Sequence, residues 1–141
     1  CQTPAGAFWV TPVDVGNPHG VVFCPEWTEE ETARVGPMLE GCPQLGERRN
    51  IEFLTVEDRE HLTVRVWERG SGVTLACASF AAARRRDLCG RKVQVRLPGG
   101  TLKVEEREGR LFMTGPAHTV FRGEIDLPWP PGPSRETDET R

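Results

Sequence analysis

The stretch TLACASFAAARRRDL, residues 74–88, carries the strongest helix signal in this chain of 141 residues. Alanine is the best helix-forming residue, and the apolar FAAA segment at 80–83 predicts a helix that is buried on most sides. Three arginines follow at 84–86, where the dipole at the C-terminal end of a helix favours cations. We therefore expect a helix that begins buried and ends in water.

Short segments of alternating polar and apolar residues surround this stretch, a pattern typical of strands. Residues 50–56 and 61–67 flank the linker EDRE and predict a hairpin. A strand, a tight turn and a second strand are predicted over 7–24. Further strands are expected at 92–97, 101–106, 110–114 and 118–125. The pattern predicts about seven strands, with no internal repeat, no βαβ alternation and no phosphate-binding loop.

A second, shorter helix is predicted after Thr28. Thr28 is followed by Glu31 three residues later, the spacing of a capping box. This pair predicts a helix over 29–35, which Gly36 and Pro37 then end or kink.

Composition limits the class of protein. The net charge of −3 gives no sign of nucleic-acid binding, and no apolar run is long enough to span a membrane. The five cysteines are widely spaced, which fits reduced thiols in the cytoplasm. We expect one domain over 1–126 and a disordered, Pro-rich and charged tail over 127–141. Because the chain begins at Cys1 rather than Met, we expect a fragment of a longer protein.

Cys77 is the first candidate for chemistry, because it lies at the start of the predicted helix. A helix N-terminus stabilises a thiolate, and its backbone N–H groups can hold a carboxylate; the alternative is a small buried core residue. Glu68 and Arg69 follow a predicted strand and could clamp an amino acid, or form a solvated ion pair. Asn17 and His19 lie in a tight turn, where turn chemistry and a surface histidine are the simpler interpretation. Asn50 begins a predicted strand. A local capping or turn role at that position is as compatible with the sequence as a functional role.

Taken together and in order, several segments resemble the C-terminal half of the diaminopimelate epimerase family. They cover nearly all of residues 8–125, and the ERGSGVTLAC and MTGPA segments are the most specific. The segments are GNPHGVVF (16–23), GPMLE (36–40), NIEF (50–53), RVWERGSGVTLAC (65–77), VRLPGGTL (95–102) and MTGPAHTVFRGE (113–124). The resemblance implies an α+β fold, with a mostly antiparallel sheet wrapped around a central helix.

The resemblance also implies an activity. The family interconverts LL- and meso-diaminopimelate, a step of lysine and cell-wall precursor synthesis, with no cofactor and no metal. One cysteine, as a thiolate, removes the α-proton, and a second cysteine delivers a proton to the opposite face. Each of two half-domains supplies one cysteine, so the resemblance implies a missing N-terminal half-domain as partner, besides the amino-acid substrate.

Roles carry over by motif. Cys77 matches the catalytic cysteine of the C-terminal half, while His19 and Glu68 match residues that tune cysteine pKa values. Glu68 also matches the residue that receives the reacting ammonium group. The remaining matches are to substrate-binding residues. These are Asn17, Asn50 and Arg69 for the distal carboxylate, and the backbone N–H groups of Ala78 and Ser79 for the reacting carboxylate.

The chain departs from the family pattern at the catalytic turn. Ala78 and Phe80 stand where the family has glycines, and we expect a Cβ atom and a phenyl ring to crowd the carboxylate site. The segment after Cys77 is shorter by roughly five residues, and Val73 stands where glutamate is common. Cys1, Cys24, Cys42 and Cys89 match no family motif. Two alternatives therefore stay open: an inactive relic or binding module of the same fold, and an isomerase of another amino acid.

Overall fold

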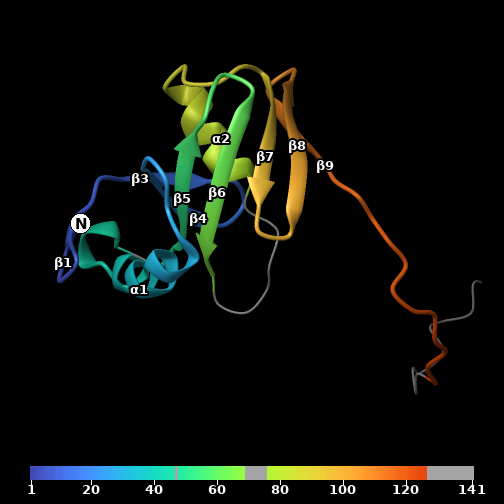
Figure 1. Ribbon diagram of the computed structural model, residues 1–141, viewed down its shortest axis with the longest axis horizontal. Helices are drawn as coiled ribbons and strands as arrows, with labels where there is room; N and C mark the ends of the chain where they lie inside the picture. Colours follow the sequence, from blue (N-terminus) through green and yellow to red (C-terminus); the bar gives the residue numbers. More distant parts are fainter. Residues whose placement is uncertain (47, 69–75, 127–141) are drawn as a thin grey trace, which may run out of the picture.

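The computed structural model describes residues 1–46, 48–68 and 76–126. Its main element is a seven-stranded sheet in the order β3-β4-β5-β6-β7-β8-β9, in which four of the six neighbouring pairs are antiparallel. The strands are β3 (Val10–Asp14), β4 (Pro18–Phe23), β5 (Asn50–Val56), β6 (His61–Trp67), β7 (Lys92–Leu97), β8 (Gly100–Arg107) and β9 (Arg110–Thr114). The α+β class and the mostly antiparallel sheet are confirmed (Figure 1).

Two of the strand pairs are parallel, and each is bridged by a helix. Helix α1 (Glu29–Glu40) lies between β4 and β5, and α2 (Ala76–Arg85) lies between β6 and β7. The expectation of no βαβ alternation is therefore wrong. The polar and apolar alternation along the strands concealed these crossovers, because alternation is the pattern of antiparallel sheets.

Strand β5 has both faces covered. Ile51 and Phe53 pack in a cluster with Val35 and Leu39 of α1. Leu54, on the opposite face, packs in the larger cluster that contains Ala78 and Phe80 of α2. Since side chains alternate along a strand, Glu52 is directed to the same face as Leu54 and toward α2.

Helix α2 is buried at its start, as its sequence predicts. Ala78, Phe80 and Ala83 are fully buried. The helix ends at Arg85, and Asp87 follows with a positive φ of 54°. The arginine run does not simply enter water: Arg84 donates to Glu106 of β8 at 3.1 Å, and the Arg86 guanidinium lies 4.2 Å from the centre of the Phe23 ring.

Helix α1 begins with the predicted capping box. The Thr28 hydroxyl accepts from the Glu31 backbone N–H, and the Glu31 carboxylate accepts from the Thr28 N–H. The helix then continues through Gly36 and Pro37 to Glu40, five residues beyond the predicted end. Gly36 is buried beneath the Trp67 side chain, so packing against β6 holds the helix together past its two breaking residues.

The N-terminal segment adds a small two-stranded sheet, β1 (Gln2–Thr3) and β2 (Gly6–Ala7), and a short 3-10 helix, η1 (Pro43–Leu45), follows α1. None of the helices described here is long and apolar enough to cross a membrane.

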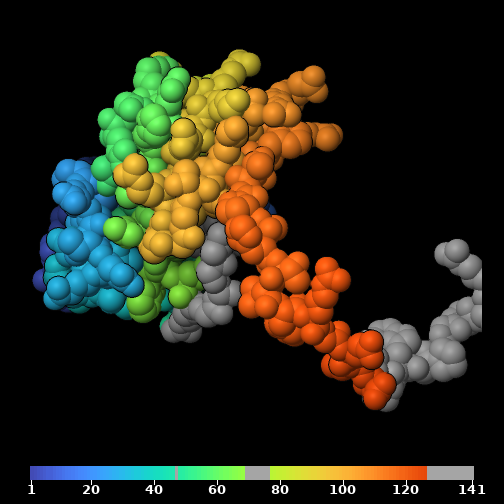
Figure 2. Space-filling view, turned by 45° about the vertical axis from the view of Figure 1, so that its right-hand side comes forward, coloured from blue at the N-terminus to red at the C-terminus, as the bar shows by residue number. Residues whose placement is uncertain are grey.

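The described part of the chain ends in an extended segment after β9. Residues 115–126 lie away from the sheet and are exposed, so the predicted strand over 118–125 is wrong (Figures 1 and 2). Val120 and Phe121 are 91% and 83% exposed, which means that no neighbouring strand covers their apolar side chains here. The tail predicted over 127–141 lies outside the described residues.

Candidate active site at the N-terminus of helix α2

The predicted site residues come from four elements that meet at one end of the sheet. His19 near the start of β4 is the register partner of Asn50, the first residue of β5. Ile51 pairs with Trp67, the last residue of β6, so Glu68 follows at the same end. The N-terminus of α2 supplies Cys77. The sequence therefore identified residues that are far apart along the chain and close together in the fold.

Cys77 is the second residue of α2 and is half-buried. The N–H groups of the first turn of a helix have no partner within the helix. Ala78 and Ser79 both belong to this turn, and both are fully buried. The Ser79 N–H donates to the Glu52 carboxylate, and the binding of a substrate carboxylate by this turn stays a prediction.

The protonation state of Cys77 differs from the prediction. Burial, and then the nearby carboxylate of Glu52, raise the pKa of the Cys77 thiol above its ordinary value of 9.0. The expectation that the helix N-terminus lowers this pKa is therefore wrong for this state of the chain. The helix dipole is present, but the loss of water and a facing acidic group outweigh it.

Glu52 is the main site residue that sequence reasoning missed. Its side chain is fully buried on β5, and the Ser79 hydroxyl donates to its Oε2. Its other oxygen, Oε1, lies 2.9 Å from Nδ1 of His19. Burial raises the pKa of the Glu52 carboxyl above 4.5, although His19 and Ser79 act in the opposite direction. The available signal was a glutamate at a core-facing position of the NIEF strand.

His19 connects Glu52 to the turn before β4. Its Nε2 lies 2.8 Å from the side-chain oxygen of Asn17. The ring is fully buried, so the interpretation as a surface histidine is wrong. A chain of polar contacts thus runs from Asn17, exposed in the turn before β4, through buried His19 and Glu52 to buried Ser79 at the start of α2.

The expected crowding by Phe80 does not occur. Its ring is fully buried in the core cluster between α2 and the sheet, together with Leu54, Leu62 and Val64. The Ala78 side chain belongs to the same cluster. Both side chains therefore fill the core rather than the region in front of the helix N-terminus.

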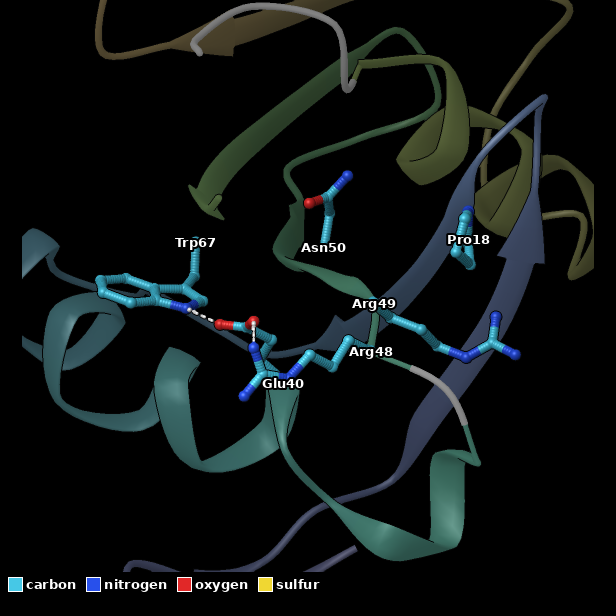
Figure 3. Close-up of a pocket in the computed structure, with 6 residues that line it drawn as sticks. All are labelled: Pro18, Glu40, Arg48, Arg49, Asn50 and Trp67. Carbon is cyan, nitrogen blue, oxygen red and sulfur yellow. Dashed lines mark hydrogen bonds and ion pairs between the residues drawn. The ribbon is translucent and has the colours of Figure 1, made fainter. Parts of the chain in front are cut away.

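A cavity of about 280 Å³ opens beside Asn50 (Figure 3). Trp67 donates from its indole N–H to Glu40 at 3.0 Å, and Arg48 lies 3.9 Å from the other oxygen of Glu40. These contacts form one wall. The remaining lining comes from Pro18, Arg49 and Asn50. Of these lining residues, only Asn50 was predicted as a site residue, because Arg48 and Arg49 fall in a loop that matches no motif.

Glu68 lies directly after β6, and its Oε2 is buried without a hydrogen-bond partner among the described residues. Arg69 and Val73 lie outside the described residues, so their predicted places are not tested. Glu68 is thus the one described member of the predicted Glu-Arg pair.

Two of the remaining cysteines, Cys42 and Cys89, are buried. Cys24 is partly buried like Cys77, and burial raises its pKa to about 11. Within residues 1–46, 48–68 and 76–126, no group of three His, Cys, Asp or Glu side chains is arranged to hold a metal ion.

Comparison with known proteins identifies the family. The profile described as "Diaminopimelate epimerase" matches residues 11–120. A diaminopimelate epimerase of Phocaeicola vulgatus is 44% identical over 122 residues, covering 82% of this chain and 44% of that protein. A diaminopimelate epimerase of Nostoc punctiforme is 43% identical over 129 residues, covering 86% of this chain and 46% of that protein. The chain therefore spans less than half the length of these relatives.

One solved structure adds support for the fold. The phenazine biosynthesis protein of the PhzF family from Bacillus anthracis superposes with a TM-score of 0.50 at 19% identity, covering 75% of this chain and 38% of that one. At this identity the similarity concerns the fold alone. The profile match and the sequence identities, together with the residues that meet at α2, show that the chain belongs to the diaminopimelate epimerase family.

Proposed function

We propose that this chain is the C-terminal half of a cofactor-independent epimerase that interconverts LL- and meso-diaminopimelate. The observation that carries the proposal is the place of Cys77, half-buried in the first turn of α2, at the edge where His19, Asn50 and Glu68 also meet. A thiol at a helix N-terminus can exchange a proton with the α-carbon of an amino acid whose carboxylate the N–H groups of that helix turn hold.

In the proposed reaction, Cys77 is the proton donor in the resting state, because its raised pKa keeps it a thiol. A thiolate from the missing half takes the α-proton, and the Cys77 S–H bond breaks as its proton goes to the opposite face of the carbanion. The substrate leaves with inverted configuration, and the two sulfur atoms have exchanged protonation states. The reverse reaction then starts from Cys77 as the thiolate.

Other residues would bind the substrate. We assign the reacting carboxylate to the backbone N–H groups of Ala78 and Ser79, and the ammonium group to Glu68, whose buried Oε2 has no hydrogen-bond partner in the described part of the chain. The distal carboxylate would bind beside Asn17, Asn50 and Arg69. Two arginines, Arg48 and Arg49, line the cavity at Asn50 together with Glu40, which pairs with Arg48, and this excess of positive charge supports an anionic group at that end of the site.

The proposal requires an N-terminal half-domain, on the same polypeptide or on a separate one, to supply the second cysteine. Exposed apolar side chains of β9 and the segment after it support a partner surface there: Leu111, Phe112, Met113, Val120, Phe121 and Ile125. The reduced cysteines support a cytoplasmic protein.

The test is α-proton exchange in D₂O, with diaminopimelate and this chain reconstituted with the N-terminal half of a related diaminopimelate epimerase. We expect deuterium to enter the α-position. We expect Cys77→Ser to reduce the rate by at least about 10³-fold, because the serine hydroxyl is a far weaker acid than the thiol and neither donates its proton readily nor forms the anion near neutral pH. Cys24→Ser serves as the matched control, since Cys24 lies at the end of β4 and should leave exchange unchanged. Undiminished exchange in Cys77→Ser would exclude Cys77 as the acid–base group.

A second candidate is a non-catalytic binding module of the same fold. The same exposed apolar residues favour it, because a relic can keep a partner surface after its chemistry is lost. The reconstitution experiment separates the two functions. A stable complex with the N-terminal half that shows no exchange would indicate the binding module.

A further inference from the structure

Two fully buried ionisable side chains lie against each other beneath α2, and the proposed reaction does not use them directly. These are His19 on β4 and Glu52 on β5, which are 2.9 Å apart through Nδ1 and Oε1. Among the described residues, neither atom makes a hydrogen bond to a third group. Each group therefore depends on this one contact, in which His19 and Glu52 form a hydrogen-bonded pair.

The hydrogen bonds that His19 and Glu52 make to other residues limit how many protons these two side chains can hold. The side-chain oxygen of Asn17 only accepts, so Nε2 of His19 carries a proton that it donates at 2.8 Å. Ser79 donates its hydroxyl proton to Oε2 of Glu52. The Nδ1–Oε1 contact then holds one proton in a hydrogen bond between the ring and the carboxyl group.

The pair is linked to the proposed active site through a single helical turn. Ser79 comes two residues after Cys77, and Glu52 is the acidic group whose charge acts on the Cys77 thiol. The register partners of Glu52 on the neighbouring strands are Val21 and Val66, which do not titrate. His19 and Cys77 are thus the titratable groups that face Glu52 in the described part of the fold.

We propose that Glu52 is a positioning residue that, paired with His19, anchors Ser79 at the N-terminus of α2 and sets the protonation state of Cys77. This inference rests on the proposed function, because it concerns the protonation of the proposed acid–base cysteine. Its test, however, requires neither substrate nor the N-terminal half. The physical reason is simple: a buried carboxylate close to a thiol opposes the formation of a second negative charge.

The test measures the alkylation rate of Cys77 by iodoacetamide from pH 6 to 10, with peptide-resolved mass spectrometry to separate it from the other four cysteines. Glu52→Gln keeps the shape of the side chain and removes its charge. We expect this variant to shift the midpoint of the Cys77 profile to lower pH and to raise the rate at pH 7.5 by about threefold to tenfold. Glu105→Gln is the matched control, because Glu105 is on β8 and pairs with Arg107 at 2.6 Å.

A purely structural role for Glu52 would change stability and leave this pH profile in place. An unchanged profile in folded Glu52→Gln therefore overturns the proposal. Failure of the exchange assay with an altered profile would overturn the proposed function alone.

A measurement on the unmodified chain keeps the test decisive if Glu52→Gln does not fold. The carbon resonance of the Glu52 carboxyl group should titrate above the ordinary range of a glutamate, because the group is buried beside His19 and Ser79. A Glu52 carboxyl group that titrates in the ordinary range would overturn the proposal.

Discussion

Glu52 has no exposed surface, and its protonation therefore affects stability in a way that depends on pH. Its pKa in the folded chain is raised above 4.5 by burial. Below pH 4.5 the group is protonated in both states and burial costs little. As pH rises toward the folded pKa, the unfolded chain ionises first, and stability is lost until the folded group also ionises.

Glu52→Gln removes this titration. We expect the unfolding free energy of the unmodified chain to fall relative to that of Glu52→Gln as the pH rises from 4.5, by about 1.4 kcal/mol for each unit by which the pKa is raised. Urea unfolding of both proteins at several pH values measures the difference. A difference that stays constant with pH would contradict the prediction.

The candidate site residues were largely predictable one at a time, and their environments were not. The ERGSGVTLAC segment identified Cys77 and Glu68, and GNPH identified Asn17 and His19. The sequence contains nothing that reveals Glu52 opposite His19, because that contact depends on the parallel register of β4 and β5. The raised pKa of Cys77 was missed for the same reason.

At the scale of elements, α1 depends on a close contact between Gly36 and Trp67. A Cβ atom on residue 36 would overlap the tryptophan side chain. We expect Gly36→Ala to lower the unfolding free energy by about 1–3 kcal/mol, although alanine is the better helix former, because overpacking outweighs propensity. Thermal unfolding measures the change.

Gly41→Ala is the matched control for that variant. Gly41 ends the same helix with a φ of −92°, and the nearest atom to an added Cβ is 3.7 Å away. We expect it to change stability by no more than about 0.5 kcal/mol. Equal losses in the two variants would show that the Trp67 contact is not responsible.

Elements with strong local signals were predicted well. Thr28 and Glu31 gave the start of α1, and alternation gave the strands from 50 to 114. The end of α1 was not predictable, because the packing of Trp67 on Gly36 overrides the local breaking tendency of Gly36 and Pro37. Local chemistry determines where these helices start, and tertiary contacts determine where they stop.

At the scale of the whole molecule, the segment after β9 leaves the apolar side chains of Val120, Phe121 and Ile125 uncovered. Phe121 is 83% exposed, so its side chain contributes little to the stability of this chain alone. We expect Phe121→Ser to change the unfolding free energy by no more than about 0.5 kcal/mol and to weaken binding of the N-terminal half by at least about tenfold. Calorimetric titration of the two halves measures the affinity.

Trp9→Ser is the control for this interface. Trp9 is 94% exposed and precedes β3, the other edge strand of the sheet. We expect it to leave the affinity for the N-terminal half nearly unchanged. An equal loss in both variants would show a general effect of surface hydrophobicity instead of a defined interface. The exposed segment could not be foreseen from the sequence, since its alternation of polar and apolar residues is that of a paired strand.

The two parallel strand pairs also determine when, during folding, the candidate site can form. The antiparallel pairs β3–β4, β5–β6 and β7–β8–β9 join neighbouring segments and need only short loops to close. The β4–β5 and β6–β7 pairs require longer loops to close, and such long-range contacts form slowly. His19 and Glu52 meet only after the first crossover closes, and Ser79 joins them only when α2 docks. The reactive end of the molecule is therefore assembled late, after its hairpins have formed.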